Sequence, residues 1–251
     1  MSNNQITIAK MKELKLKGMR KAFEACLETR QFQNMTQDEF IAYLVQQEWE
    51  QRQNNRISQA IYRAKFRYQA SIEQINFSQN RNLNKNMIMR LAECSFVEKR
   101  ENIIITGSTG VGKSYLASAL GHQACVKGFK VIYHNTAKLF TKLMNAKGDG
   151  TYAREISRIE KQDLLILDDF GLQPIDQQLR LALLEIIEDR HGKKSTIIAS
   201  QIPVSNWYEL LEEKTIADAI LDRVVHTSHR IELKGESMRK KQAQKQNESI
   251  V

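Results

Sequence analysis

The 251-residue chain is basic, with 38 Lys and Arg against 29 Asp and Glu and a formal net charge of +9. Its 41% hydrophobic content suffices for a sizeable core, but no apolar run reaches the length of a membrane span and the first ten residues lack the apolar core of a signal peptide, so we expect a cytoplasmic protein with no membrane partner. The three cysteines (Cys26, Cys94 and Cys125) are far apart in the sequence, which predicts reduced packing residues rather than disulfides or a metal site.

The positive charge is concentrated in the two flanks of the chain. Residues 1–100 hold 17 basic and 10 acidic side chains, a net of +7, and residues 230–251 hold 6 and 3, a net of +3. Residues 101–229 hold 15 and 16, a net of −1. This asymmetry favours a nucleic-acid partner contacted by the flanks, the alternative being a solvated basic face without a partner.

The first hundred residues are predicted to be mostly helical. Apolar side chains recur at helical spacing between residues 6 and 28. Thr36 and Glu39 then have the spacing of a capping box, followed by the apolar face of a second helix that runs towards Tyr68, either continuous or broken at Asn54 and Asn55.

Four arginines are regularly spaced along the second helix. At about 100° per residue they fall within roughly 60° of arc, a single cationic ridge if the helix is continuous. Guanidinium groups pair well with phosphate, so the ridge is a candidate DNA-binding surface; an exposed face, or pairing with Glu48 within the helix, is the open alternative. The residues are Arg52, Arg56, Arg63 and Arg67.

Residues 76–86 are polar and rich in asparagine, which predicts a linker between domains. We therefore expect a basic helical domain over residues 1–80 for DNA binding or oligomerisation, a second domain over 81–234, and a polar basic tail over 235–251.

A strand, a glycine-rich loop and a helix follow one another between Asn102 and Leu120. The loop has the pattern GxxxxGK[ST], whose backbone N–H groups cradle phosphates while the lysine neutralises phosphate charge and the hydroxyl ligates Mg²⁺. ATP and Mg²⁺ are the expected cofactors, so residues 81–234 are the expected ATPase domain; a plain glycine turn is the alternative. The loop residues are Gly107, Ser108, Thr109, Gly110, Val111, Gly112, Lys113 and Ser114.

A further strand is predicted at residues 131–133, and the segment 163–171 reads as a strand buried on both faces. Two carboxylates, Asp168 and Asp169, stand at the carboxyl end of that strand, where open α/β sheets bind ligands. Two adjacent acids beside a phosphate loop are costly without a cation. We assign Asp168 to the Mg²⁺ shell and Asp169 to orienting or deprotonating the attacking water.

Between these strands, Lys147, Arg154 and Arg158 form a basic segment broken by Gly148 and Gly150. It is a candidate DNA contact, with a plain surface turn as the alternative.

Two more candidate site residues lie later in the chain. Gln201, or alternatively Ser200, ends a strand at 195–201 where a polar side chain can hold water or contact the terminal phosphate. Arg223 closes a helix and is a candidate to complete a neighbouring subunit's site, unless it only pairs with Asp218 or Asp222. A fifth strand is expected at 230–233.

The ordered segments GSTGVGKS, DLLILDDFG, STIIASQIP, DAILDRVVH and HRIELKGESMRK resemble the AAA+ ATPases of the DnaC and IstB branch, the closer match being IstB-type helper ATPases of insertion sequences. The likeness extends to AKFRYQASIEQINF, LASALGHQAC and KGDGTYAR and so covers nearly the whole chain. It implies a parallel sheet of order 5-1-4-3-2, ATP sites shared between subunits, and an arginine finger at Arg223.

The sequence departs from the general AAA+ pattern in two respects. The acid after Asp168 is usually glutamate, whereas Asp169 is one methylene shorter. Eighteen residues follow Leu233, too few for the usual helical lid, so we expect no lid arginine, with Arg239 as a candidate substitute. Both features suggest slow hydrolysis that acts as a timer.

The resemblance implies that ATP and Mg²⁺ assemble a homo-oligomer on double-stranded DNA, which deforms the duplex largely without regard to sequence, delivers it to the transposase of the same element, and is released on hydrolysis. One alternative is a DnaC-like replicative helicase loader that prefers single strands. Another is a small-molecule P-loop kinase, which requires an acceptor pocket and a lid.

Overall fold

The computed structural model describes residues 2–29, 34–77 and 81–238, and the chain consists of two compact units, Met1–Gln59 and Ala60–Val251. Arg239 and the tail after it lie outside the described residues. None of the described helices combines the length and the apolar composition that crossing a membrane requires.

The first unit is helical, as predicted. Its helices are α1 (Asn3–Glu13), α2 (Lys17–Thr29) and most of α3 (Gln37–Ala64). The capping box at the start of α3 is formed, because Glu39 N–H donates to Thr36 Oγ1 and Thr36 N–H donates to Glu39 Oε2. Helix α3 continues through Asn54 and Asn55 without a break.

Helices α2 and α3 are joined at a close crossing. The buried carboxylate of Glu48 accepts hydrogen bonds from the Gly18 and Met19 N–H groups at 2.8 and 3.1 Å, which satisfies donors that the first turn of α2 leaves unpaired. A Cβ at Gly18 would lie 2.3 Å from the Gln47 carbonyl oxygen, so only glycine permits this approach.

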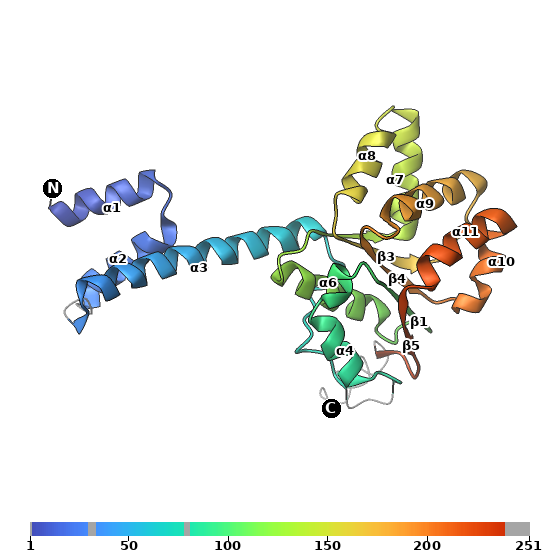
Figure 1. The fold of residues 1–251 in the computed structure, drawn as a ribbon, viewed down its shortest axis with the longest axis horizontal. Helices are drawn as coiled ribbons and strands as arrows, with labels where there is room; N and C mark the ends of the chain where they lie inside the picture. The colour runs from blue at the N-terminus through green and yellow to red at the C-terminus, as the bar shows by residue number, and fades with distance from the viewer. Residues whose placement is uncertain (1, 30–33, 78–80, 239–251) are drawn as a thin grey trace, which may run out of the picture. The chain divides into compact units, whose positions relative to one another are not determined.

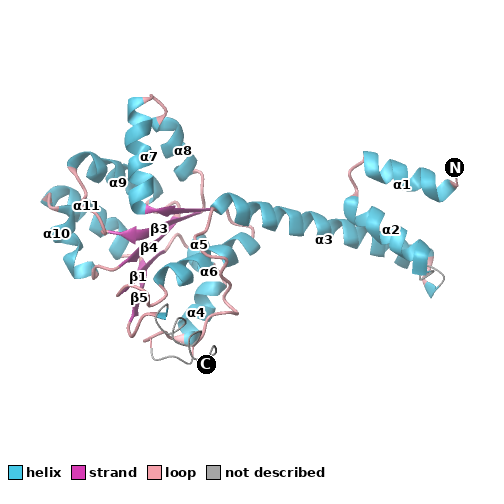
Figure 2. Cartoon of the chain, turned by 180° about the vertical axis from the view of Figure 1, so that it is seen from behind, coloured by secondary structure: helices cyan, strands magenta, loops and turns pink. Residues whose placement is uncertain are grey.

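The second unit is built on a five-stranded parallel sheet (Figures 1 and 2). The strand order β2-β3-β4-β1-β5 is the predicted 5-1-4-3-2 order read from the other edge, so the AAA+ fold prediction is confirmed. The strands are β1 (Asn102–Gly107), β2 (Val131–Asn135), β3 (Leu164–Phe170), β4 (Ser195–Ser200) and β5 (Ser228–Leu233).

Helices cover both faces of this sheet, because alternate residues of the central strands are apolar on each side. Ile103, Ile105 and Ile166 pack on one face, in the same cluster as α4 (Lys85–Ala92), α5 (Ser95–Glu98) and α6 (Lys113–Val126). Ile104 and Leu165 pack on the other, in the cluster of the remaining helices. These are α7 (Thr136–Gly148), α8 (Tyr152–Glu160), α9 (Gln177–Arg190), α10 (Trp207–Leu211) and α11 (Lys214–Val225).

The cationic ridge ends earlier than the sequence predicted. Helix α3 stops at Ala64, and Lys65 has a left-handed φ of 58°, so Arg67 is not on the helix and does not belong to the ridge. A left-handed residue cannot continue a right-handed helix. The backbone beyond this turn is fixed in the second unit, where Ala64 is fully buried and the Phe66 ring packs against Tyr133.

The described part of the asparagine-rich segment is bonded to the second unit, whereas the sequence suggested a linker there. Arg81 donates to the Val111 and Asn76 carbonyls, and Asn82 donates to the Glu232 carbonyl in β5. The boundary between the two units lies at Gln59, ahead of this segment.

Candidate functional site

The glycine loop has the backbone that phosphate binding requires. Gly107 and Gly112 have φ values of 146° and 105°, which L side chains rarely adopt, and a Cβ at Gly107 would lie 2.2 Å from the Leu233 carbonyl oxygen. Helix α6 begins at Lys113, so its unpaired N–H groups and positive dipole end face the loop. The nearly buried Lys113 ammonium donates to the Ser108 carbonyl at 2.8 Å. The loop is therefore formed around an anion site.

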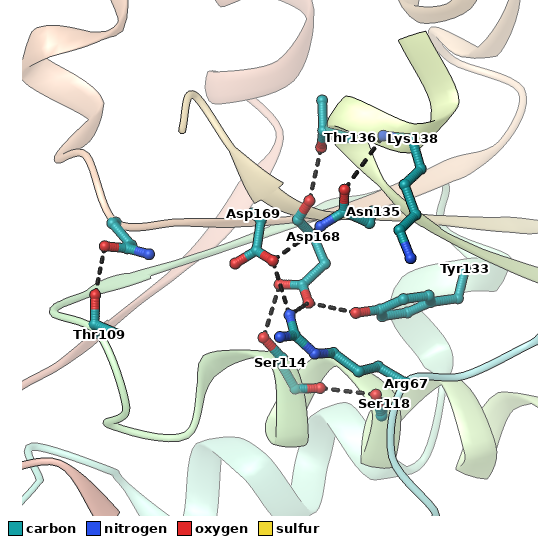
Figure 3. A network of polar contacts seen from close by, with 11 residues as sticks. Arg67, Thr109, Ser114, Ser118, Tyr133, Asn135, Thr136, Lys138, Asp168 and Asp169 are labelled. Carbon is teal, nitrogen blue, oxygen red and sulfur yellow. Dashed lines mark hydrogen bonds and ion pairs between the residues drawn. The ribbon is translucent and has the colours of Figure 1, made fainter. Parts of the chain in front are cut away.

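The two carboxylates at the end of β3 lie together, although neighbouring strand residues normally point to opposite faces. Two irregularities account for this: the pairing of β3 with β4 shifts register between Leu167 and Phe170, and Asp169 has a left-handed φ of 56°. The turn brings the Asp169 carboxylate to the same side as that of Asp168 (Figure 3). One cation can then serve both.

Asp168 is fully buried and accepts from three donors (Figure 3). Ser114 Oγ donates to Oδ1 at 2.9 Å, the Tyr133 hydroxyl donates to Oδ2, and Arg67 Nη1 lies 3.4 Å from the same oxygen. Burial, together with the neighbouring Asp168 carboxylate, raises the pKa of Tyr133 well above its usual value, so this hydroxyl remains a donor.

Asp169 is held by two donors on a single oxygen. Arg67 Nη1 and Asn135 Nδ2 lie 2.7 and 2.9 Å from Oδ2. The Asn135 side chain also accepts from Lys138 N–H and caps α7, which fixes the amide. Partial burial by itself lowers the pKa of Arg67, but the hydrogen bond to Asp169, together with electrostatic interactions with Asp169, Tyr68 and Tyr133, outweighs it and raises that pKa above the usual range.

A cavity of about 590 Å³ lies over these groups, within the range of small-molecule sites. Its walls include Lys113, Ser114, Asp169 and Gln201, so the structure brings together the predicted loop and acidic residues. Apolar side chains, among them Ile75, Leu83 and Leu233, line it as well. The cavity therefore offers phosphate-binding groups beside an apolar region.

The oxygen donors suit magnesium. The Ser114 hydroxyl lies against the buried Asp168 carboxylate, and Mg²⁺ is usually held by one or two such protein oxygens with substrate phosphates and water completing its shell. Within residues 2–29, 34–77 and 81–238 there is no cluster of three or more His, Cys, Asp or Glu suited to a metal by itself.

The structure separates the two candidates at the end of β4. Ser200 is fully buried, donates to the Phe170 carbonyl and accepts from Ile202 N–H, so its hydroxyl is occupied within the fold. Gln201 lines the cavity and accepts from Thr109 Oγ1 of the glycine loop at 2.6 Å. Of the two residues, Gln201 is the one whose side chain faces the cavity.

Arg223 lies at the opposite end of the sheet from the loop of its own chain. The Asn102 amide, at the start of β1, donates to the Arg223 and Val224 carbonyls, whereas the loop follows the end of β1. Five residue steps along a strand span about 17 Å. The guanidinium itself pairs with Glu188 at 2.8 Å rather than with Asp218 or Asp222. Arg223 cannot reach the nucleotide site of its own chain from here.

The candidate DNA-binding residues differ in their exposure and in whether their side chains are paired within the protein. Arg52 pairs with Glu48 at 2.8 Å, the alternative that the sequence left open, although its side chain stays 62% exposed. Arg56 and Arg63 are exposed on α3 and have no ion pair among the described residues. Arg154 and Arg158 line a groove of about 430 Å³ along α8, together with Lys161. Lys147, at the end of α7, lies 5.0 Å from the centre of the Tyr152 ring.

Three residues of the site were not identified from the sequence: Arg67 in this role, Tyr133 and Asn135. Tyr133 and Asn135 lie on β2, which pairs with β3 in register Asn135 to Asp168. Knowledge of that pairing would have placed them beside the carboxylates. No sequence signal points to Arg67, because its place depends on where α3 ends.

The chain is similar to known proteins over nearly its whole length. The family described as IstB-like ATP binding protein matches residues 9–246. A putative insertion-sequence ATP-binding protein of Sinorhizobium fredii is 42% identical over 239 residues, which cover 95% of this chain and 98% of the relative. The putative ATP-binding protein of insertion sequence IS21 from Pseudomonas aeruginosa is 30% identical over 235 residues, or 94% and 89% of the two chains.

Among solved structures, the crystal structure of the DnaC helicase loader superposes with a TM-score of 0.53 at 23% identity, covering 69% of this chain and 98% of that one. At this identity the likeness concerns the fold alone. It confirms the AAA+ architecture of the second unit.

Proposed function

The chain belongs to the family of IstB-like ATP-binding proteins, and from this premise we propose that it is the ATP-dependent helper of an insertion sequence, which oligomerises on double-stranded target DNA, deforms it and delivers it to the transposase of the same element. The observation that carries the proposal is the similarity over 95% of the chain to a protein described as an insertion-sequence ATP-binding protein. The membership also argues against the small-molecule kinase. The chain is an AAA+ ATPase. We assign the separate tasks of phosphate binding, metal binding and water positioning to different residues in and around its cavity.

In the proposed ATPase reaction, the loop amides and Lys113 bind the phosphates, and Ser114 with Asp168 holds Mg²⁺. Bound by these two residues, Mg²⁺ would neutralise phosphate charge. Asp169 positions the attacking water, and Gln201 contacts the terminal phosphate from the end of β4. Arg223 of a neighbouring copy completes the site, because it cannot reach the site of its own chain.

The proposed DNA contacts are backbone contacts. No acidic residue occurs between Gln51 and Ile72, a stretch that contains the exposed Arg56 and Arg63. Arg52 stays a weaker candidate because Glu48 pairs with it. The groove of Arg154 and Arg158, with Lys147 at the end of α7, is a second basic surface. Such contacts give affinity with little sequence preference, and deformability of the duplex then selects targets.

The test measures binding to fluorescent duplex and single-stranded DNA of equal length, with ATP and Mg²⁺, with ADP, and without nucleotide. We expect ATP-dependent duplex binding by an oligomer and none by Lys113→Ala. A clear single-strand preference would instead support a helicase loader. A chain that stays monomeric at saturating ATP, Mg²⁺ and duplex would contradict the proposal.

A further inference from the structure

Arg67 occupies a position in the ATP site that the phosphate-binding motif does not supply. It follows the end of α3 by three residues, in a segment anchored by the buried Ala64 and by Phe66. The Phe66 ring packs so closely on α6 that a Cβ at Gly121 would lie 2.6 Å from it. The backbone of this segment is therefore fixed, while the Arg67 side chain, 39% exposed, extends into the cavity.

The Arg67 guanidinium contacts both carboxylates through one nitrogen. Nη1 lies 2.7 Å from Asp169 Oδ2 and 3.4 Å from Asp168 Oδ2 (Figure 3). Within the described residues, Nε and Nη2 make no hydrogen bond to either acid, although a guanidinium presents five donors in a fork that matches phosphate oxygens. The group thus keeps donors for a second anion.

The other cations lining the cavity are placed differently. Arg81 donates to the Val111 and Asn76 carbonyls, and Lys113 starts α6 with its ammonium on the Ser108 carbonyl. Arg67 contacts both members of the carboxylate pair, next to Ser114, where the motif places the metal ion and the terminal phosphate.

We propose that Arg67 senses the terminal phosphate of ATP in its own subunit by exchanging Asp169 for that phosphate. The terminal phosphate, which ADP lacks, attracts the guanidinium, and a cation held by Ser114 and Asp168 would weaken the attraction of the guanidinium to the carboxylates. Loss of the ion pair leaves Asp169 Oδ2 with the Asn135 amide as its remaining donor. Oδ2 can then accept a hydrogen bond from water. Binding of ATP therefore makes Asp169 available to position the water that attacks the terminal phosphate. This inference rests on the ATPase assignment of Asp169 made in the proposed function.

The test compares nucleotide affinities rather than turnover. Fluorescent ADP and a fluorescent non-hydrolysable ATP analogue are titrated, with Mg²⁺, into the full-length wild type, Arg67→Gln, Arg67→Lys and Lys65→Gln. Lys65 is the matched control, since it is exposed two residues away and has no ion pair among the described residues. Thermal unfolding of each variant establishes that it is folded.

We expect Arg67→Gln to lower the affinity for the ATP analogue at least tenfold and the affinity for ADP less than twofold. The affinity of Arg67→Lys for the ATP analogue should lie between those of Arg67→Gln and the wild type, because lysine keeps the positive charge but lacks the forked donors of a guanidinium. The affinities of Lys65→Gln should match those of the wild type. The proposal would be overturned if Arg67→Gln lowered the affinities for both nucleotides equally, or if it changed neither affinity.

A second measurement needs no substitution. Hydrogen exchange of the wild type should differ between the ADP-bound and ATP-analogue-bound states at residues 64–70, which surround Arg67. Identical exchange in the two states would also overturn the assignment. Neither measurement involves DNA, so their failure is separate from failure of the proposed function.

Discussion

The position of Arg223 predicts that two inactive variants restore each other's ATPase activity. Arg223→Ala removes the arginine given to a neighbour, and Asp169→Asn removes the acid that acts on bound ATP in its own subunit. Because Arg223 lies about one strand length, roughly 17 Å, from the loop of its own chain, each interface needs one intact arginine and one intact acid from different copies.

The size of the recovery is set by this geometry. Loss of an arginine finger lowers turnover by about 10³-fold or more, so each variant alone should be almost inactive. In an equal mixture about one interface in four joins an Asp169→Asn subunit, which supplies Arg223, to an Arg223→Ala subunit, which supplies Asp169, in the productive direction. We therefore expect about a quarter of wild-type turnover per site, maximal at equal mixing and falling to zero at either end.

The assay is phosphate release at constant total protein across the mixing series, with duplex DNA present. Arg100→Ala is the matched control, since Arg100 lines the same groove as Arg223 but bonds to the Gly192 carbonyl. It should keep its turnover. No recovery at any ratio, from variants that still bind ATP, would refute the shared site.

Three further predictions concern the basic helix, the half-buried His134 and the helix crossing. Changing Arg56 and Arg63 together to Gln should reduce the slope of log affinity for duplex DNA against log salt concentration by up to about 2, as measured by fluorescence anisotropy. The control Arg20→Gln, which removes an arginine already paired with Glu24, should leave that slope unchanged. Burial, with help from Lys142 and Arg158, lowers the pKa of His134 to about 4, against about 6.5 in the unfolded chain. Between these pH values the unfolded chain binds one more proton at His134 than the folded chain does, so the free energy of unfolding should fall as the pH drops through 6.5, by at most about 3 kcal/mol at pH 4. The urea midpoint of His134→Asn should lack this part of the pH dependence. Gly18→Ala should destabilise the α2–α3 crossing by about 2 kcal/mol, because its Cβ meets backbone rather than a movable side chain, and unchanged hydrogen-exchange protection of α2 would contradict this.

The sheet and the phosphate loop were predictable because their signals are local. Short apolar runs such as Ile103–Ile105 and Leu164–Leu167 define strands that are buried on both faces, and the loop motif specifies the turn after β1. The order of the strands came from the family resemblance. The register shift that brings Asp168 and Asp169 together depends on pairing with β4, which no local pattern encodes.

The asparagine-rich segment shows why polarity alone is a poor guide to a linker. It offers few apolar anchors, yet Arg81 and Asn82 attach it to the glycine loop and to β5 through main-chain carbonyls, and Asn84 caps α4. Hydrogen bonds to backbone depend on tertiary position and leave no periodicity in the sequence.

Arg67 shows the opposite error, since a helical period was extended beyond the end of the helix. Spacing placed it on a DNA-binding ridge, but the left-handed turn at Lys65 directs the chain into the ATP site. This bears on the expected slow hydrolysis, which the sequence attributed to the shorter side chain of Asp169. In the structure Asp169 Oδ2 is already engaged by Arg67 and Asn135, so a water that binds this oxygen must compete with two donors whatever the length of the acid. We therefore attribute the expected slow hydrolysis to these two donors more than to the missing methylene.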